Sequence, residues 1–238
     1  MGAEKGAEMI RGFDVSFWQD NIDWDKAAKQ DSKFCFIKAS QDTTADTQFA
    51  RNWKEAKRVG FLRGAYHFAD YRTYAVPQAQ YMWSLLKDDP GELPPVLDLE
   101  QYWTPLPPGS RALAWVKDWG SEMSRLCGSK PILYTSPSVI KYWLATIPDW
   151  LKEWPLWIAN YGVSEPGYSP WPKWTLWQYS TVGPGTAYGM QSLGLDMDWF
   201  NGSLEELQAF CGKKPEPKPL PTLEVMVEKL WAAHPELH

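Results

Sequence analysis

Short runs of strand-forming residues alternate with helix-like segments along most of this 238-residue chain. Two of the intervening segments, 76–86 and 112–126, repeat apolar residues at helical spacing, so each would present one apolar stripe to a sheet. This alternation is typical of parallel strands joined by crossover helices, as in an α/β barrel or a doubly wound sheet. The predicted strands are Ile10–Val15, Phe34–Ala39, Leu62–Phe68, Pro95–Glu100, Ile132–Thr135, Leu156–Asn160, Thr175–Tyr179 and Leu195–Met197.

The final third of the chain has a different composition. After about Tyr142 the spacers are rich in Pro, Gly and Trp, as in SEPGYSPWPKW (164–174) and TVGPGTAYG (181–189). Such spacers leave no room for helices between the last three predicted strands. We therefore expect an irregular TIM-like α/β barrel with a helix-poor C-terminal third.

Composition also suggests where the barrel domain begins and ends. Residues 1–9 are interpreted as an N-terminal extension and 10–211 as the barrel. The whole chain is 44% hydrophobic and can build one large core. Residues 212–221, GKKPEPKPLP, are typical of an extended linker. Residues 222–238 carry apolar side chains at helical spacing and are predicted to form a short amphipathic helix. Two alternatives stay open for this helix: it docks on the barrel, or it leads into a further module.

The charge distribution argues against two classes of partner. The net charge of -5 comes from 24 basic and 29 acidic residues without long runs of either sign, so neither nucleic acid nor a membrane surface is a predicted partner. No apolar segment is long enough to span a bilayer, and residues 1–16 lack the pattern of a secretory signal. We expect a protein made in soluble form in the cytoplasm, with no membrane insertion.

The three cysteines give no indication of a metal site. Cys35, Cys127 and Cys211 are widely separated and lack metal-ligand spacing, so reduced structural thiols are expected. The acidic residues discussed next have no accompanying set of histidines. Neither a metal nor a cofactor is predicted.

A pair of carboxylates ends the fourth predicted strand, in the stretch PPVLDLE (94–100). Because side chains alternate between the two faces of a strand, Asp98 and Glu100 share one face, about 6–7 Å apart, while Leu97 and Leu99 share the other. If the leucines face the helices, the acids face the barrel interior at the carboxyl end of the strand. Barrel enzymes collect their catalytic groups at this end.

Two further carboxylates are predicted at the same mouth of the barrel. Asp14 lies at the end of the first predicted strand and Asp196 at the end of the last. Four clustered carboxylates repel one another, and a fold tolerates this mainly where the chemistry uses it. Such a cluster suits cleavage of a glycosidic bond, with Glu100 as proton donor and Asp98 as stabilising anion. Asp14 and Asp196 would tune both.

Several motifs, taken in order along residues 10–202, resemble those of the lysozymes of glycoside hydrolase family 25, the muramidases of phage endolysins and bacterial autolysins. In combination these motifs are specific, whereas any one alone would be weak. They are GFDVSFWQ (12–19), GAYHFA (64–69), PVLDLE (95–100), ILYTS (132–136), PLWIANY (155–161), LWQYS (176–180) and LDMDWFNG (195–202).

The resemblance implies a fold, an activity and a substrate. The fold is an irregular barrel with eight strands and about five helices. The activity is that of a peptidoglycan hydrolase that cleaves the β-1,4 bond between N-acetylmuramic acid and N-acetylglucosamine. The implied partners are peptidoglycan glycan strands, attacked by a monomer after its release to the bacterial cell wall, with or without an appended wall-binding module.

The resemblance also assigns roles to individual residues. Glu100 matches the catalytic acid, Asp98 its partner, and Asp14 and Asp196 the two outer carboxylates. The anomeric configuration is retained, with the substrate's own acetamido group as nucleophile and Asp98 orienting it. Asp198 stands where the family commonly has Asn and is interpreted as structural or solvent-facing.

Aromatic and amide side chains in the matched motifs are the candidate substrate-binding residues. For each of them, filling the barrel core is the competing interpretation, and His67, next to Tyr66 on a predicted strand, is interpreted as a core histidine. Trp103 is interpreted either as a glycan contact or as packing under a loop. The candidates are Tyr66, Tyr134, Trp157, Gln178 and Trp18.

Three alternatives stay open at this point. A chitinase-like glycosidase also uses an acid-x-acid pair, although the further acid two residues earlier is replaced here by Val96. A non-catalytic glycan-binding barrel would be expected to lack the acid at Glu100, which is present. A cell-wall anchor would act through a module beyond residue 221.

Overall fold

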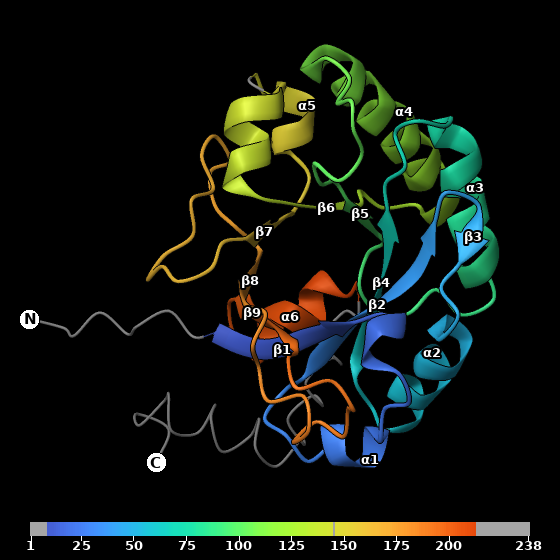
Figure 1. Cartoon of the computed structure of the whole chain (residues 1–238), viewed down its shortest axis with the longest axis vertical. Helices are drawn as coiled ribbons and strands as arrows, with labels where there is room; N and C mark the ends of the chain where they lie inside the picture. Colours follow the sequence, from blue (N-terminus) through green and yellow to red (C-terminus); the bar gives the residue numbers. More distant parts are fainter. Residues whose placement is uncertain (1–8, 145, 213–238) are drawn as a thin grey trace, which may run out of the picture.

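A nine-stranded sheet forms the centre of the protein (Figure 1). The structure is a computed structural model that describes residues 9–144 and 146–212. β1 pairs with both β2 and β9, so eight strands close into a barrel, and the short β3 (Thr44–Ala45) is attached to the end of β2. The barrel strands are β1 (Met9–Val15), β2 (Phe34–Gln41), β4 (Leu62–Phe68), β5 (Val96–Asp98), β6 (Ile132–Thr135), β7 (Leu156–Ala159), β8 (Leu176–Ser180) and β9 (Asp196–Asn201). All eight predicted barrel strands are confirmed.

Strand direction differs at one place in the barrel. Neighbouring strands from β1 through β8 are parallel, whereas β9 runs antiparallel to both β8 and β1. Asp196 is therefore the first residue of its strand and not, as predicted, near the end of it. Since β9 is reversed, its beginning lies at the carboxyl ends of the parallel strands, and Asp196 pairs in register with Asp14.

The longer helices cover one side of the barrel. α2 (Phe49–Arg58), α3 (Ala75–Leu86) and α4 (Gly109–Cys127) lie along β2, β4 and β5, and the segments between β7, β8 and β9 contain no helix (Figure 1). The helix-poor final third is thus confirmed. With five shorter segments counted, the described residues contain six α-helices, one 3₁₀ helix and one π-helix. This total exceeds the five or so helices implied by the resemblance because it includes single helical turns. The shorter segments are α1 (Trp24–Ala27), α5 (Asp149–Lys152), α6 (Leu204–Phe210), η1 (Phe17–Gln19) and η2 (Val139–Leu144).

Two apolar clusters hold the barrel together. Leu97 and Leu99 belong to the outer cluster, together with Trp119 and other residues of α4. Val96, on the opposite face of β5, belongs to the inner cluster that fills the barrel. This division confirms that the face of Asp98 is the interior face. The inner cluster consists of Phe34, Phe36, Leu93, Val96, Ile132, Tyr134, Trp157, Ala159, Leu176, Phe200 and Leu207, the last from α6.

The barrel interior is crowded enough to require glycine on two strands. A Cβ atom at Gly12 would lie 2.3 Å from the Phe34 ring, and one at Gly64 would lie 2.1 Å from the Phe36 ring. Both distances are far below a van der Waals contact. Large side chains at these positions are therefore excluded, and the aromatic rings fill the space.

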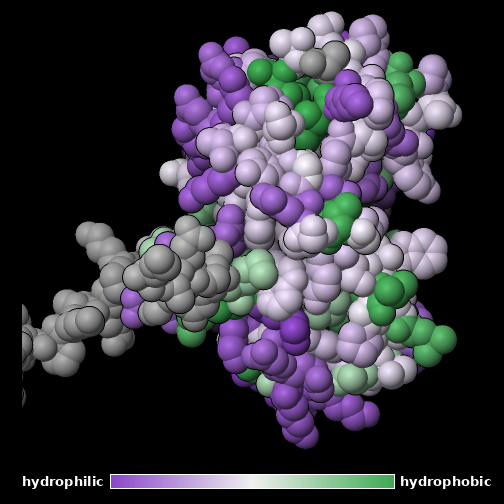
Figure 2. Space-filling view, turned by 90° about the vertical axis from the view of Figure 1, so that its left-hand side faces the viewer, coloured by the Kyte–Doolittle hydropathy of each residue, from purple (hydrophilic) through white to green (hydrophobic). Residues whose placement is uncertain are grey.

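The surface has no large apolar region on the face shown in Figure 2. Hydrophobic residues there form small separate groups among hydrophilic ones. Within residues 9–144 and 146–212, no helix combines the length and apolar content needed to cross a bilayer.

Arg63 supplies a test of what stabilises the helix-covered side. Its side chain is 0% exposed and donates hydrogen bonds to Asp89 and Glu92. Replacing Arg63 with Met is expected to lower the free energy of unfolding by about 3 kcal/mol, because both carboxylates lose a buried partner. Urea denaturation measures the change. Arg125→Met, which removes an exposed ion pair with Glu122, is the control and should cost much less.

Candidate active site

A cavity of about 270 Å³ opens at the mouth of the barrel formed by the carboxyl ends of the parallel strands. Its volume is near the lower end of the range of small-ligand pockets. All nine predicted site residues line it, and they come from β1, β4, β5, β6, β7, β8, β9 and η1. The lining residues are Asp14, Ser16, Trp18, Gln19, Lys38, Tyr66, Phe68, Asp98, Glu100, Tyr134, Trp157, Tyr161, Gln178 and Asp196.

The carboxylate pair lies where β5 ends. Asp98 is the last residue of the strand and is 7% exposed, whereas Glu100 is half-buried. The chain stays tied to β6 beyond the strand, because Leu99 N–H donates to the carbonyl of Tyr134 at 2.9 Å and the Thr135 hydroxyl donates to the carbonyl of Leu99 at 3.0 Å. These bonds fix the backbone between the two acids.

Burial and mutual repulsion make the carboxyl groups weak acids. Burial raises the pKa of Asp98 well above its usual range, and the charge of Glu100 raises it further. Burial also raises the pKa of Glu100, although Lys38 and the hydroxyl of Tyr134 lower it. Burial and then Glu100 raise the pKa of Asp196 to about 6. The pair therefore keeps a proton at a higher pH than isolated carboxyls would, and Glu100 is the more accessible of the two.

Gln178 organises the floor of the cavity. Its Oε1 atom accepts hydrogen bonds from the hydroxyls of Tyr134, at 2.8 Å, and Tyr161. The amide nitrogen must therefore be its other end, and it donates to Asp14 Oδ2 at 2.6 Å. This network fixes the side-chain orientation of Asp14.

The predicted aromatic residues differ in how freely they can meet a ligand. Trp157 is 2% exposed, stacks on Phe36 with ring centroids 4.4 Å apart and donates its indole N–H to Asp198, so most of its ring is barrel core. Trp18, on η1, is 72% exposed. Tyr66 is half-buried, and its ring packs against the inner cluster.

The interpretation of Asp198 as solvent-facing is wrong. Its side chain is 0% exposed and lies below the cavity, where Oδ1 accepts the Trp157 indole N–H at 2.8 Å. Asp198 is inside because β9 alternates its faces: Asp196 and Asp198, two residues apart, both point inward. The same spacing rule applied to Asp98 and Glu100 could have found it in the sequence.

Lys38 and Tyr161 were not predicted as site residues. The Lys38 ammonium donates to Gln41 Oε1 at 3.1 Å and lies 4.8 Å from the centre of the Phe68 ring. Burial lowers its pKa, while Asp98, Asp46 and Glu100 raise it. A single lysine inside the apolar strand FCFIKAS was the available signal. Tyr161 follows β7 and offers no comparable signal.

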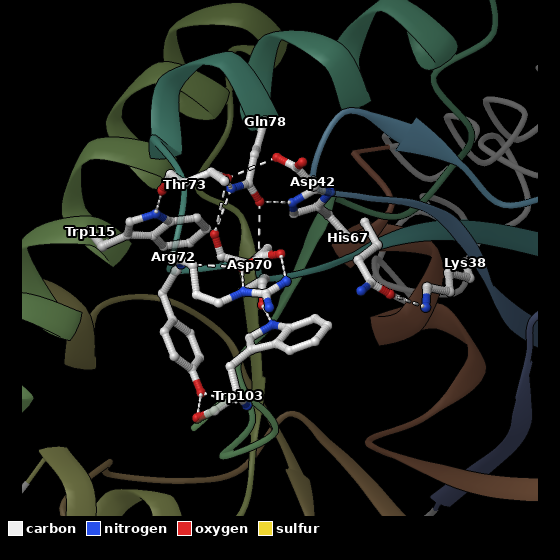
Figure 3. Close-up of polar contacts among 12 residues, drawn as sticks. Lys38, Asp42, His67, Asp70, Arg72, Thr73, Gln78, Trp103 and Trp115 are labelled. Carbon is white, nitrogen blue, oxygen red and sulfur yellow. Dashed lines mark hydrogen bonds and ion pairs between the residues drawn. The ribbon is translucent and has the colours of Figure 1, made fainter. Parts of the chain in front are cut away.

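His67 and Trp103 are not among the residues that line the cavity. Figure 3 shows the polar contacts that hold each of them elsewhere. The ring of His67 is fully buried between Ser40 and Gln78, 2.9 and 2.8 Å from its two nitrogens, and burial lowers its pKa to about 4. The core interpretation of His67 is confirmed. Trp103 donates its indole N–H to the carbonyl of Ala69 and is covered by the Arg72 guanidinium at 3.6 Å, which is packing under a loop.

Among the residues that the structure describes, no group of three or more His, Cys, Asp or Glu side chains is arranged to hold a metal ion. The carboxylates of the cavity instead face one another, a lysine and several hydroxyl groups. Their chemistry is that of proton transfer and charge stabilisation.

A closed barrel whose mouth presents a buried acid pair at the end of the fourth parallel strand, beside aromatic side chains, defines a glycoside hydrolase. Residues 13–186 match the model of the Glycosyl hydrolases family 25, and the chain belongs to that family.

The chain is similar to several proteins, two of which are named as lysozymes. The chain is 33% identical over 207 residues to the protein YegX of Escherichia coli (strain K12), covering 84% of this chain and 73% of that protein. It is 32% identical over 222 residues to Lysozyme M1 of Streptomyces globisporus, covering 85% and 71% respectively. The crystal structure of the bacterial lysozyme from Streptomyces coelicolor superimposes with a TM-score of 0.78 at 29% identity, covering 89% of this chain and 100% of that one.

Proposed function

We propose that this protein is a muramidase that hydrolyses the β-1,4 bond between N-acetylmuramic acid and N-acetylglucosamine in peptidoglycan. Membership of family 25 and similarity to lysozymes support the reaction class. The observation that carries the proposal is the convergence of Asp14, Asp98, Glu100 and Asp196 in one cavity of about 270 Å³.

The proposed reaction has two steps. Glu100 gives its proton to the glycosidic oxygen while the bond from that oxygen to the anomeric carbon breaks, and the substrate's acetamido oxygen attacks the same carbon. Asp98 accepts the acetamido N–H and stabilises the positive charge of the cyclic intermediate. Glu100, now ionised, then takes a proton from water, which attacks the anomeric carbon and reopens the ring with retained configuration.

The other cavity residues are proposed to hold the sugar chain. The exposed ring of Trp18 offers an apolar face at the rim, and Tyr66 offers a hydroxyl inside. Tyr134, Trp157 and Gln178 shape the floor, where their hydrogen bonds to one another and to the acids limit them to indirect roles. Because one chain supplies the entire lining, we propose that the protein acts as a monomer on the cell wall.

Product analysis tests the proposed bond. Purified peptidoglycan is digested, the fragments are reduced, and the sugar at each new reducing end is identified by mass spectrometry. We expect N-acetylmuramic acid ends. New N-acetylglucosamine ends or cleaved peptides alone would contradict the assignment, and faster cleavage of chitin oligomers than of peptidoglycan would favour the chitinase-like alternative.

Lys38 gives a prediction about pH. Its charge lowers the pKa of both Asp98 and Glu100, so Lys38→Met is expected to raise both. Glu100 then keeps its proton to higher pH and Asp98 needs higher pH to ionise, which moves the activity optimum toward alkaline pH. The measurement is kcat/KM on peptidoglycan across pH, with Lys54→Met on the exposed side of α2 as control. An unmoved optimum would remove Lys38 from this role.

A further inference from the structure

Asp198 and Asp14 form a buried contact between two carboxyl groups. The side chains are 0% and 6% exposed, and the two carboxyl groups lie within hydrogen-bonding reach of each other. The contact follows from the sheet, because Asp198 pairs in register with Gly12, two residues before Asp14, and both acids point into the barrel. Two ionised carboxylates have no hydrogen atom to share, so this contact requires a proton.

The surrounding donors do not remove that requirement. Gln178 donates to Asp14 Oδ2, and its orientation is fixed by the two tyrosine hydroxyls on its oxygen. Trp157 donates to Asp198 Oδ1. The remaining oxygen, Asp198 Oδ2, is buried, and no donor group of the described residues forms a hydrogen bond to it. A buried oxygen in this state is costly unless it carries a proton that it can donate.

We propose that Asp198 is held as a neutral carboxylic acid whose Oδ2–H donates to Asp14, so that the pair carries one negative charge and Asp14 is fixed in place. Asp198 is the more deeply buried partner, and burial disfavours its charged form more strongly. Asp198 is thus a positioning residue: it acts on the cavity through Asp14. The consequence for catalysis rests on the proposed function, but the protonation state does not.

The groups that face the pair favour this state. Burial raises the pKa of both Asp14 and Asp198, and the charge of Asp196 raises both further. Asp98 of β5 adds to the rise for Asp14, whereas hydrogen bonding with Gln178 lowers the pKa of Asp14 and hydrogen bonding with Trp157 and Asp14 lowers that of Asp198 without reversing the shift. Glu100 adds to the negative charge of the same cavity, while Lys38 of β2 acts on Asp98 and Glu100. The hydroxyls of Tyr66, Tyr134 and Tyr161, from β4, β6 and the end of β7, are neutral because burial raises the pKa of each.

An Asn at position 198 would supply an N–H donor in the same place. The amide donates at every pH, whereas the acid donates only while protonated. The proposal therefore predicts that Asp198 makes the geometry of Asp14 sensitive to alkaline pH. Asp198→Asn should remove that sensitivity, and Asp198→Leu, of similar size, should remove the donor altogether.

Carbon-13 NMR of the aspartate carboxyl groups tests the protonation state without substrate. At pH 7 the folded wild-type chain should show a protonated aspartate signal that disappears in Asp198→Asn and remains in Asp196→Asn. The proposal is overturned if Asp198→Asn retains every protonated signal of the wild type. Thermal unfolding provides a second measure: the extra folded-state proton makes stability fall as pH rises above about 4, and Asp198→Asn should reduce this slope.

Activity on peptidoglycan then tests the positioning role. Asp198→Leu is expected to lower kcat/KM about 10-fold or more below Asp198→Asn, since Asp14 and the Trp157 N–H both lose a partner. The alkaline limb of the Asp198→Asn profile should differ from that of the wild type. Equal losses in the two variants, with both folded by circular dichroism, would show that the negative charge of Asp198 matters and not its proton. If the wild type cleaves no glycan, the proposed function fails while the NMR result still decides this inference.

Discussion

Replacing Glu100 with Gln is expected to lower kcat on peptidoglycan by about 10²- to 10⁴-fold, the usual contribution of general acid catalysis. The amide has nearly the same shape as the acid but no proton that it can transfer to the glycosidic oxygen. Binding should change little because the half-buried side chain keeps its volume. The measurement is the rate of new reducing ends at saturating substrate, with KM determined alongside.

The control for Glu100→Gln is Glu165→Gln, which makes the same chemical change at an exposed position outside the cavity lining. It should leave kcat and KM unchanged. Thermal unfolding of both variants shows whether a loss of activity reflects misfolding. If Glu100→Gln turns over at the wild-type rate, Glu100 is not the general acid, and the mechanism proposed for this cavity is wrong.

The sequence predicted the fold well where a local pattern determines the structure. Eight strands were predicted within a few residues of their ends, since each combines β-branched or aromatic residues with flanking turns. α2 was not predicted although Phe49, Trp53 and Ala56 repeat at helical spacing with charged residues on the other faces, so this local signal was present and was missed. The reversed direction of β9 has no local signal, because it depends on which strands the segment pairs with.

The candidate site shows the same division between local and global information. Asp98 and Glu100 were found through a spacing within one strand. Asp196 was placed at the correct mouth of the barrel although two assumptions about its strand were wrong. The strand was expected to be parallel with Asp196 at its end, whereas it is antiparallel with Asp196 at its start, and both arrangements put the residue at the same mouth. Asp198 lies two residues from Asp196 on the same strand, so applying the spacing rule to this pair as well would have placed Asp198 inside the barrel.

Asp98→Asn is expected to reduce kcat by about 10³-fold, close to the effect at Glu100. In the proposed mechanism Asp98 accepts the acetamido N–H and faces the developing positive charge, and an uncharged amide does neither well. Its removal also takes a negative charge away from Glu100. Glu100 should then lose its proton at lower pH, so the alkaline limb of the residual activity should move toward acid.

Two measurements on the wild type distinguish two roles for Asp98. If Asp98 orients the acetamido group, then substrates that lack this group should be poor for the wild type, and no covalent link between sugar and protein should form. If Asp98 is itself the nucleophile, mass spectrometry of the wild type with a slow fluorinated substrate should find a sugar attached to Asp98. Asp118→Asn, on the exposed face of α4, is the matched control and should affect neither measurement.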